Sequence, residues 1–198
     1  GALLGKYNSC QVSKPGGCSL GPRDYGWHLK GFSRLGASNN LKAGYIHLSA
    51  KKGLKGNTFK FPKITVTGTS NLIMASVLAK GSTILKNIAI EPEILDLIEF
   101  LNKGGAKIKF VGNRTIKIFG VKKLIGCSHK IIGDRIEAFS YLCTAIITNG
   151  KIRVKNINPN HLSSELKILK KMGCILNVKN SSIELKNSKK LRPVKIKT

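Results

Sequence analysis

The sequence predicts an α/β (α+β) fold made of repeated βαβαββ units. In three stretches, leucines and isoleucines recur at helical spacing, stop at a glycine, and are followed by two short segments in which apolar and polar residues alternate. The first pattern is typical of an amphipathic helix and the second of strands with one buried face. Because the helices are apolar enough to be buried, we expect the units to pack with helices inward and sheets outward.

Each of the three stretches predicts a helix followed by a β-hairpin. They span residues 28–50, 95–120 and 166–187. Glycine is favoured just past the last turn of a helix, which places the helix ends at Gly36, Gly104 and Gly173. Turn-forming residues mark the hairpins of the second and third stretches, at Gly112-Asn113 and Asn180-Ser181.

A strand, a helix and a second strand are expected before the second and the third stretch. They are residues 64–68, 70–81 and 82–88 in one case, and 129–133, 134–150 and 151–157 in the other. The first copy of the unit is incomplete, because Gly1–Gly5 looks like the end of a helix and no initiator methionine is present. We therefore expect a fragment. A small autonomous protein is the weaker alternative, since a unit without its first strand leaves an unpaired sheet edge.

Composition indicates a globular chain with enough apolar side chains for a core. Hydrophobic residues make up 41% of the chain, aromatic residues 6%, and the mean hydropathy is −0.05. No apolar run approaches the roughly 20 residues that span a bilayer, and no secretory signal opens the chain. We expect a soluble, cytoplasmic protein with no membrane partner.

The net charge of +26 and the pI of about 10.2 favour a nucleic-acid-binding protein at first sight. The lysines are instead spread through every segment, with no basic helix and no strand studded with aromatic residues. We expect no specific nucleic-acid partner. Non-specific binding of polyanions remains as a property, and the positive field favours phosphorylated small molecules.

One cysteine of five has surroundings that favour reactivity. Cys10, Cys127, Cys143 and Cys174 are scattered, without a C-x-x-C pair or a histidine at ligand spacing, which argues against disulfides, a zinc site or any other metal. Cys143 and Cys174 are expected to lie in the core or next to it. Cys18 follows Pro15-Gly16-Gly17 and precedes Arg23, and a guanidinium both stabilises a thiolate and binds phosphate oxygens. An ordinary glycine-rich turn is the alternative reading.

Four motifs in order carry a family resemblance over essentially the whole chain. They are QVSKPGGCSLGPRDYGWH, which ends at His28, TVTGTSNLIMASVLAKGSTILKN at 65–87, EPEILDLIEFLNKGGAKI at 91–108 and GDRIEAFSYLCTAIITNG at 133–150. The chain resembles the UDP-N-acetylglucosamine enolpyruvyltransferase family. The resemblance implies an inside-out α/β barrel, here incomplete. Residues 1–132 would form the later part of the domain with the cysteine loop and 133–198 one unit of the second domain, with a hinge near Gly133-Asp134.

The chemistry implied by the resemblance is transfer of enolpyruvate from phosphoenolpyruvate to the 3'-hydroxyl of UDP-N-acetylglucosamine, the first committed step of peptidoglycan synthesis. Cys18 matches the family's general acid, which also forms a covalent adduct with phosphoenolpyruvate. Arg23 matches a phosphate-binding arginine. The segments that match the family's nucleotide-sugar contacts are Asp24, Tyr25, Gly26 and Trp27, and Lys63, Ile64, Thr65 and Val66. The resemblance implies no cofactor, and only the two small-molecule substrates as partners.

A further set of residues falls on motif positions near the cleft or hinge of the family: Asn71, Glu91, Glu93, Asp134, Arg135 and Glu137. The carboxylates among them also precede apolar periodic runs, where they would cap helices or interact with the helix dipole. Capping and substrate contact both stay open for these residues. Lys63 has the alternative reading of an ordinary surface lysine, and Arg23 that of a solvated loop arginine. His28 is expected to be structural rather than a general base.

The stretch Asp24–His28 departs from the family pattern, which has proline, valine, aspartate, leucine and histidine there and holds the uracil ring. Tyr25 and Trp27 can still stack on a base. The alternatives are a divergent enolpyruvyltransferase with another acceptor, or a non-catalytic basic polyanion-binding protein. Because several family essentials are absent, including the proposed general base, we expect residues 1–198 alone to be inactive.

Overall fold

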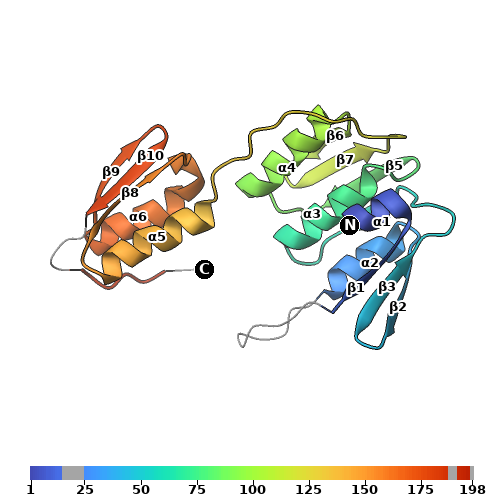
Figure 1. The fold of residues 1–198 in the computed structure, drawn as a ribbon, viewed down its shortest axis with the longest axis horizontal. Coiled ribbons are helices and arrows are strands. Elements are labelled where there is room, and N and C mark those ends of the chain that lie inside the picture. The colour runs from blue at the N-terminus through green and yellow to red at the C-terminus, as the bar shows by residue number, and fades with distance from the viewer. Residues whose placement is uncertain (15–24, 187–190, 197–198) are drawn as a thin grey trace. The chain divides into compact units, whose positions relative to one another are not determined.

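The computed structural model describes residues 1–14, 25–186 and 191–196. The chain divides into two compact units, Gly1–His129 and Lys130–Thr198 (Figure 1). The boundary lies a few residues before the division after Ile132 that the sequence suggested. Each unit has a hydrophobic core of its own.

The first unit contains two sheets and four helices among its described residues. In one sheet the strand order is β1-β3-β2, and all pairs are antiparallel. In the other the order is β4-β5-β7-β6, with β4 and β5 parallel and the other pairs antiparallel. The elements are α1 Ala2–Tyr7, β1 Ser9–Ser13, α2 Gly26–Arg34, β2 Ser38–Lys42, β3 Tyr45–Ser49, β4 Thr58–Lys60, α3 Val66–Ser76, β5 Ser82–Lys86, α4 Pro92–Lys103, β6 Lys107–Gly112 and β7 Thr115–Phe119.

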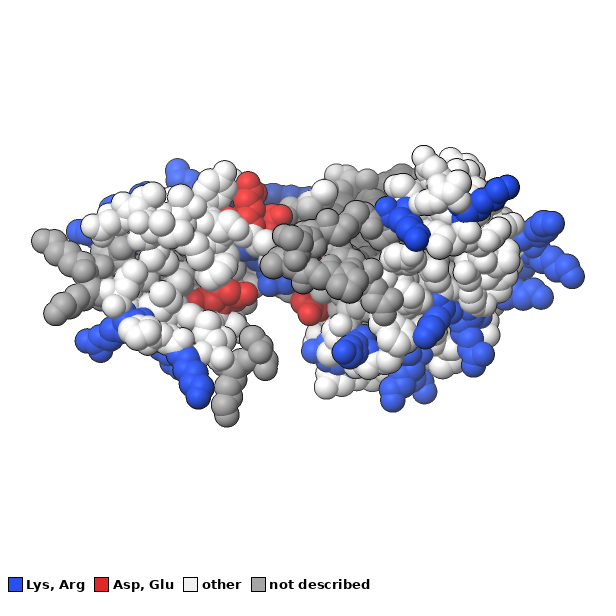
Figure 2. Space-filling view, turned by 90° about the horizontal axis from the view of Figure 1, so that it is seen from below, with Lys and Arg blue, Asp and Glu red and all other residues white. Residues whose placement is uncertain are grey.

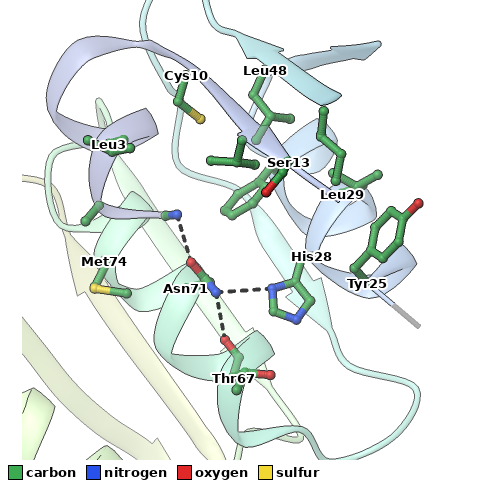
Figure 3. A pocket seen from close by; sticks show the side chains of 15 residues that line it. Leu3, Cys10, Ser13, Tyr25, His28, Leu29, Leu48, Thr67, Asn71 and Met74 are labelled. Carbon is green, nitrogen blue, oxygen red and sulfur yellow. Dashed lines mark hydrogen bonds between the residues drawn. The ribbon is translucent and has the colours of Figure 1, made fainter. Parts of the chain in front are cut away.

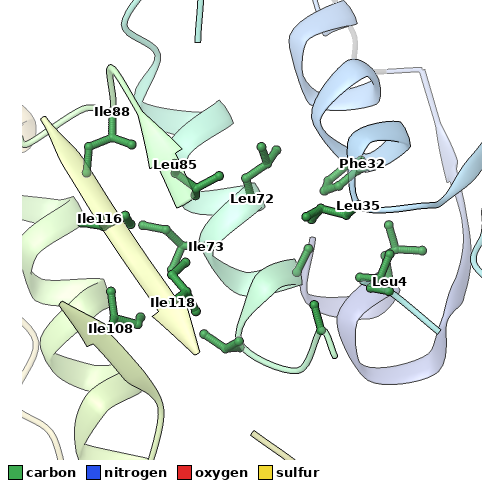
Figure 4. Packing of buried hydrophobic residues seen from close by; sticks show 14 of the residues in the cluster. Leu4, Phe32, Leu35, Leu72, Ile73, Leu85, Ile88, Ile108, Ile116 and Ile118 are labelled. Atoms are coloured by element: carbon green, nitrogen blue, oxygen red, sulfur yellow. The ribbon is translucent and has the colours of Figure 1, made fainter. Parts of the chain in front are cut away.

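Helix α3 forms the centre of this unit and contacts α1, α2 and α4. Its Leu72 and Ile73 are fully buried. In Figure 4, Leu72 lies toward Phe32 of α2 and Leu35, the C-cap residue of that helix, whereas Ile73 lies toward the sheet residues Ile116 and Ile118. A helix with apolar residues on nearly all sides needs such an interior position. The predicted packing, with helices inward and sheets outward, is therefore found in this unit.

The second unit is a three-stranded antiparallel sheet of order β8-β10-β9 with two helices on one face (Figure 1). Leu142 of α5, Leu169 of α6 and Leu185 of β10 are buried between helices and sheet. The elements are α5 Arg135–Ile147, β8 Lys151–Lys155, the 3-10 helix η1 Pro159–Leu162, α6 Ser163–Met172, β9 Ile175–Lys179 and β10 Ser182–Lys186.

The helix ends and one hairpin turn follow the prediction closely. Gly36 and Gly173 adopt left-handed backbone angles just past α2 and α6, with φ of 90° and 100°. Helix α4 ends at Gly104 as expected, but the left-handed residue there is Gly105, with φ of 91°. The turn at Asn180-Ser181 is confirmed. The other turn lies at Asn113-Arg114, one residue later than predicted, because β6 contains an irregularity between Phe110 and Gly112.

Two predicted strands are wrong. Residues 64–68 alternate like a strand, but α3 begins at Val66 because the Thr65 hydroxyl accepts a hydrogen bond from the Gly68 amide and caps the helix. The strand of this region is β4, Thr58–Lys60. Residues 129–133 are irregular. Their first residue, His129, is held by a side chain of α4 and not by a neighbouring strand.

Candidate functional site

The glycine-rich cysteine segment connects β1 to α2. Cys18, Arg23 and Asp24 lie outside the described residues, so the structure leaves their predicted roles untested. The flanking residues are described: β1 ends at Ser13, and Tyr25 is the N-cap residue of α2. Both line the same cavity, which therefore lies where this segment begins and ends.

The cavity has a volume of about 520 Å³ and is lined mainly by apolar side chains (Figure 3). Its walls come from α1, β1, α2, β3 and α3. A largely apolar pocket with a few convergent polar groups is the usual form of a small-molecule site. The lining residues are Gly1, Ala2, Leu3, Cys10, Val12, Ser13, Tyr25, His28, Leu29, Phe32, Ile46, Leu48, Thr67, Asn71 and Met74.

Asn71 organises the polar wall of the cavity (Figure 3). Its Oδ1 accepts a hydrogen bond from the Gly1 ammonium at 2.8 Å. Its Nδ2 donates to the Thr67 carbonyl and lies 3.2 Å from His28 Nδ1. Since an amide NH₂ is a donor, His28 Nδ1 is the acceptor of this hydrogen bond. The predicted cleft residue Asn71 thus adjoins the cavity.

His28 belongs to this wall, although the sequence alone favoured a structural role for it. Its bond to Asn71 orients the ring, which is a structural task, while its position on the cavity also suits contact with a ligand. Sequence reasoning missed Thr67 and did not pair His28 with Asn71. The spacing of four residues between Thr67 and Asn71 on one helix face was the available signal.

Two cysteines that adjoin the core have thiols unsuited to nucleophilic chemistry. Burial raises the pKa of the Cys10 thiol in the cavity wall, although the Gly1 ammonium partly opposes this effect. Burial likewise raises the pKa of Cys174, which is buried in the second unit as expected. A raised pKa keeps a thiol protonated at neutral pH.

The two aromatic residues at the start of α2, Tyr25 and Trp27, lie in different environments. Tyr25 is half-buried and lines the cavity. Gly26 begins the helix, and the Lys30 ammonium lies 4.5 Å from the centroid of the Trp27 ring, a cation–π contact. One face of Trp27 is therefore engaged by a cation in this structure.

Residues Lys63 to Val66 lead into α3, whose Thr67 and Asn71 line the cavity. Lys63 and Ile64 are exposed. Thr65 caps the helix, and Val66 packs against the core. Of the predicted site residues, Tyr25 and Asn71 line the cavity, whereas Gly26, Trp27 and Lys63 to Val66 are not among its lining residues.

The predicted acidic residues do not line this cavity. Glu91 is the N-cap residue of α4 through its backbone, and one of its carboxylate oxygens is buried without a hydrogen-bond partner. Glu93 stands in the first turn of the same helix. Both residues stand at the start of α4, where a carboxylate interacts favourably with the helix dipole, but the Glu91 side chain makes no capping hydrogen bond.

Asp134, Arg135 and Glu137 belong to the second unit. Asp134 Oδ1 accepts hydrogen bonds from the amides of Ile136 at 2.7 Å and Glu137 at 3.0 Å, so it caps α5. The Arg135 guanidinium lies 3.6 Å from the Glu165 carboxylate of α6. The capping reading thus holds for Asp134.

The basic side chains, the possible metal ligands and the helix lengths of the described residues bear on other kinds of site. Figure 2 shows lysine and arginine side chains scattered over the visible face and not gathered into one stripe. Within the described ranges, no three His, Cys, Asp or Glu side chains are grouped as metal ligands. No helix in the described part of the chain has the length and apolar character needed to cross a bilayer.

Comparison with known proteins adds a family match and close relatives. The model of the family described as EPSP synthase (3-phosphoshikimate 1-carboxyvinyltransferase) matches residues 1–198. Proteins named UDP-N-acetylglucosamine 1-carboxyvinyltransferase are 44% identical in Pelagibacter ubique, over 198 residues, and 46% identical in Helicobacter pylori strain P12, over 200 residues. Each match covers 100% of this chain, but 48% and 47% of the relative. The chain thus spans about half the length of these relatives.

Solved structures show the same fold. The enolpyruvyl transferase NikO from Streptomyces tendae superimposes with a TM-score of 0.79 at 22% identity, over 96% of this chain and 46% of that one. An EPSP synthase from Acinetobacter baumannii gives 0.69, also at 22% identity, over 98% of this chain and 46% of that one. The predicted enolpyruvyltransferase-like fold is confirmed, as is its incompleteness relative to these structures.

Proposed function

Because this chain belongs to the EPSP synthase family of carboxyvinyltransferases, we propose that it is the part of a UDP-N-acetylglucosamine enolpyruvyltransferase that bears the catalytic cysteine. The observation that carries the proposal is the 44–46% identity, over the full chain, to proteins named for this activity. The acceptor would be the 3'-hydroxyl of UDP-N-acetylglucosamine and the donor phosphoenolpyruvate. The enzyme would act in the cytoplasm, in peptidoglycan synthesis, and so serve cell shape and division.

The reaction proceeds by addition and then elimination. The acceptor oxygen forms a bond to C2 of phosphoenolpyruvate while a proton is added to the C3 methylene, which yields a tetrahedral intermediate. Loss of phosphate from C2 and of one C3 proton then restores the double bond in the product. Cys18 supplies the proton to C3, and such general acid catalysis is typically worth about 10²- to 10⁴-fold in rate. Its sulfur also forms a covalent adduct at C2, and Arg23 binds the phosphate oxygens.

The residues that lead into α2 and α3 would position the substrates. Tyr25 and Trp27, with Asp24 and Gly26, would hold the base of the nucleotide, and Lys63 to Val66 would hold its sugar and phosphates. His28 and Asn71 supply hydrogen-bonding groups at the cavity from which the cysteine segment departs. Asn71, Glu91, Glu93, Asp134 and Arg135 would act near the cleft or the hinge of the full-length enzyme.

The two units, Gly1–His129 and Lys130–Thr198, would correspond to parts of the two family domains, which the sequence divides into residues 1–132 and 133–198. Several of the groups that the family resemblance implies lie outside this chain, including the general base. We therefore expect residues 1–198 alone to catalyse no turnover, and repeated turnover by the purified chain would refute this.

Intact-mass spectrometry tests the proposal most directly. The chain, completed to the length of its relatives, is incubated with phosphoenolpyruvate or the epoxide fosfomycin, with and without UDP-N-acetylglucosamine. We expect one adduct, promoted by the sugar nucleotide and absent from Cys18→Ser. Cys127→Ser is the matched control, because that exposed thiol lies outside the proposed site and its loss should leave the adduct unchanged.

The other outcomes distinguish the competing functions. An adduct on Cys18 that is indifferent to UDP-N-acetylglucosamine would support a different acceptor, in line with the unusual residues Asp24 to Trp27. No adduct, together with tight and strongly salt-dependent binding to nucleic acid, would support a polyanion-binding protein.

A further inference from the structure

The irregular segment that follows β7 is bonded along helix α4 before it leaves the first unit. The Ile125 amide donates to the Gly104 carbonyl at 2.9 Å. Two residues later, the Cys127 thiol lies 3.7 Å from the Phe100 carbonyl as a weak donor. These contacts lead the chain back along the helix toward its N-terminus.

His129 ends this segment and makes its most buried polar contact. Its Nε2 lies 2.9 Å from Asp96 Oδ1, and the two side chains are only 5% and 14% exposed. Its Nδ1 lies 3.3 Å from the Lys103 ammonium, and its ring lies 5.6 Å from that of Phe100. All three partners belong to α4 and share one face of it, so the ring lies against that face.

The two nitrogen contacts define one protonation state of the ring. An ammonium group only donates, so Nδ1 is the acceptor toward Lys103, and the proton on Nε2 is donated to Asp96. Lys103 also forms an ion pair with Glu99 at 2.8 Å. A neutral ring with its proton on Nε2 satisfies both nitrogens, which is what a nearly buried histidine requires.

The chain is held again four residues later, within the second unit. Gly133 packs so closely on the Asn156 carbonyl oxygen that a Cβ there would overlap it. The following residue, Asp134, caps α5. Only Lys130, Ile131 and Ile132 stand between the two attachments, and Ile131 is 76% exposed.

We propose that His129 is a positioning residue that fixes the point at which the chain leaves the first unit. Changes in orientation between the units are then absorbed by Lys130–Ile132 alone, since hinges consist of a few residues that absorb changes in φ and ψ. Without the contact to Asp96, the free segment would extend back toward Ile125. The inference depends on these contacts and not on the proposed function, and its test uses no substrate.

Hydrogen exchange of the 198-residue chain tests the tether. In His129→Ala we expect the Ile125 amide, which donates to the Gly104 carbonyl, to exchange roughly tenfold faster, because the segment loses a charge-assisted hydrogen bond. His129→Gln should restore much of the protection, since its amide can donate to Asp96. His161→Ala is the matched control, because that histidine lies in the second unit beside Asn158.

Small-angle scattering of the same variants tests positioning. We expect a wider distribution of interatomic distances for His129→Ala than for the wild type. The distribution should be unchanged for His129→Gln and His161→Ala. Unchanged exchange of the Ile125 amide in His129→Ala would overturn the tether. Faster exchange with unchanged scattering would overturn its role in positioning.

Two further measurements apply if His129→Ala does not fold. Asp96→Asn has nearly the same shape and weakens the same bond, so faster exchange of the Ile125 amide is again expected. Nitrogen NMR of the wild-type ring at pH 8 should show the proton on Nε2, and a proton on Nδ1 would overturn the assignment.

Discussion

At the scale of single residues, close backbone approach at Gly120 offers a sharp test of the first unit. A Cβ at this position would overlap the Ala79 carbonyl oxygen, which belongs to the backbone and cannot rotate away as a side chain can. We predict that Gly120→Ala lowers the free energy of unfolding of this unit by about 2 kcal/mol or more, as overpacking of a filled site does. Urea denaturation measures the change.

Gly126→Ala is the control for this prediction. A Cβ at Gly126 meets no atom within 4 Å, and its φ lies outside the left-handed region. Its effect should stay within about 0.5 kcal/mol, as for ordinary surface substitutions. Equal effects of the two substitutions would show that the contact between Gly120 and Ala79 is not formed.

At the scale of elements, the N-terminus of α5 separates helix capping from substrate contact. Asp134 accepts two amide hydrogen bonds there, so Asp134→Ala should destabilise the second unit by about 1 kcal/mol, whereas Asp134→Asn keeps an acceptor and should cost much less. Thermal unfolding of the chain checks both. If Asp134→Asn lowered the stability as much as Asp134→Ala, helix capping would not be the role of Asp134.

The sheet β8-β10-β9 gives a prediction about pH. Hydrogen bonds from Lys151 and Arg153 lower the pKa of Glu184 from 4.5 to about 2. A carboxyl group whose pKa is lower in the folded chain than in the unfolded chain stabilises the fold at pH values above its unfolded pKa of 4.5. This contribution is lost as the pH falls from 4.5 through about 2. Glu184→Gln should therefore remove part of the acid sensitivity of the second unit.

Chemical denaturation between pH 6 and pH 2 checks this. The difference in stability between wild type and Glu184→Gln should shrink as the pH falls, and it should also shrink with added salt. Glu137→Gln is the comparison, because that carboxylate stands in the first turn of α5 and not between two cations. A difference that is independent of pH would contradict the ion-pair explanation.

At the scale of the whole molecule, two separate cores predict two separable unfolding events. Leu142→Ala, at a fully buried position of the second unit, should cost that unit about 2–5 kcal/mol and leave hydrogen exchange in Gly1–His129 unchanged. Ile147 on the same helix is 84% exposed, so Ile147→Ala should hardly change the stability of that unit. Faster exchange in both units after Leu142→Ala would show that they unfold as one.

Local pattern predicted the helices and the hairpins but misassigned two segments. Residues 64–68 alternate like a strand, and only the hydrogen bond from the Gly68 amide to the Thr65 hydroxyl shows that a helix begins there. For residues 129–133, the apolar character suggested a strand, whereas the first of them is bonded to α4. A strand requires a neighbouring strand, and a local pattern contains no information about the neighbour.

The sequence by itself determined the class of fold, the helix ends and the family, because periodicity, glycine caps and ordered motifs are local properties that persist in any arrangement of the elements. Tertiary structure alone decided which residues form the cavity wall and how the chain leaves the first unit. His28 and Asn71 are 43 positions apart, and Asp96 and His129 are 33 apart. Such pairs form only when packing brings two helices, or a helix and a loop, to hydrogen-bonding distance, and no local pattern specifies that distance.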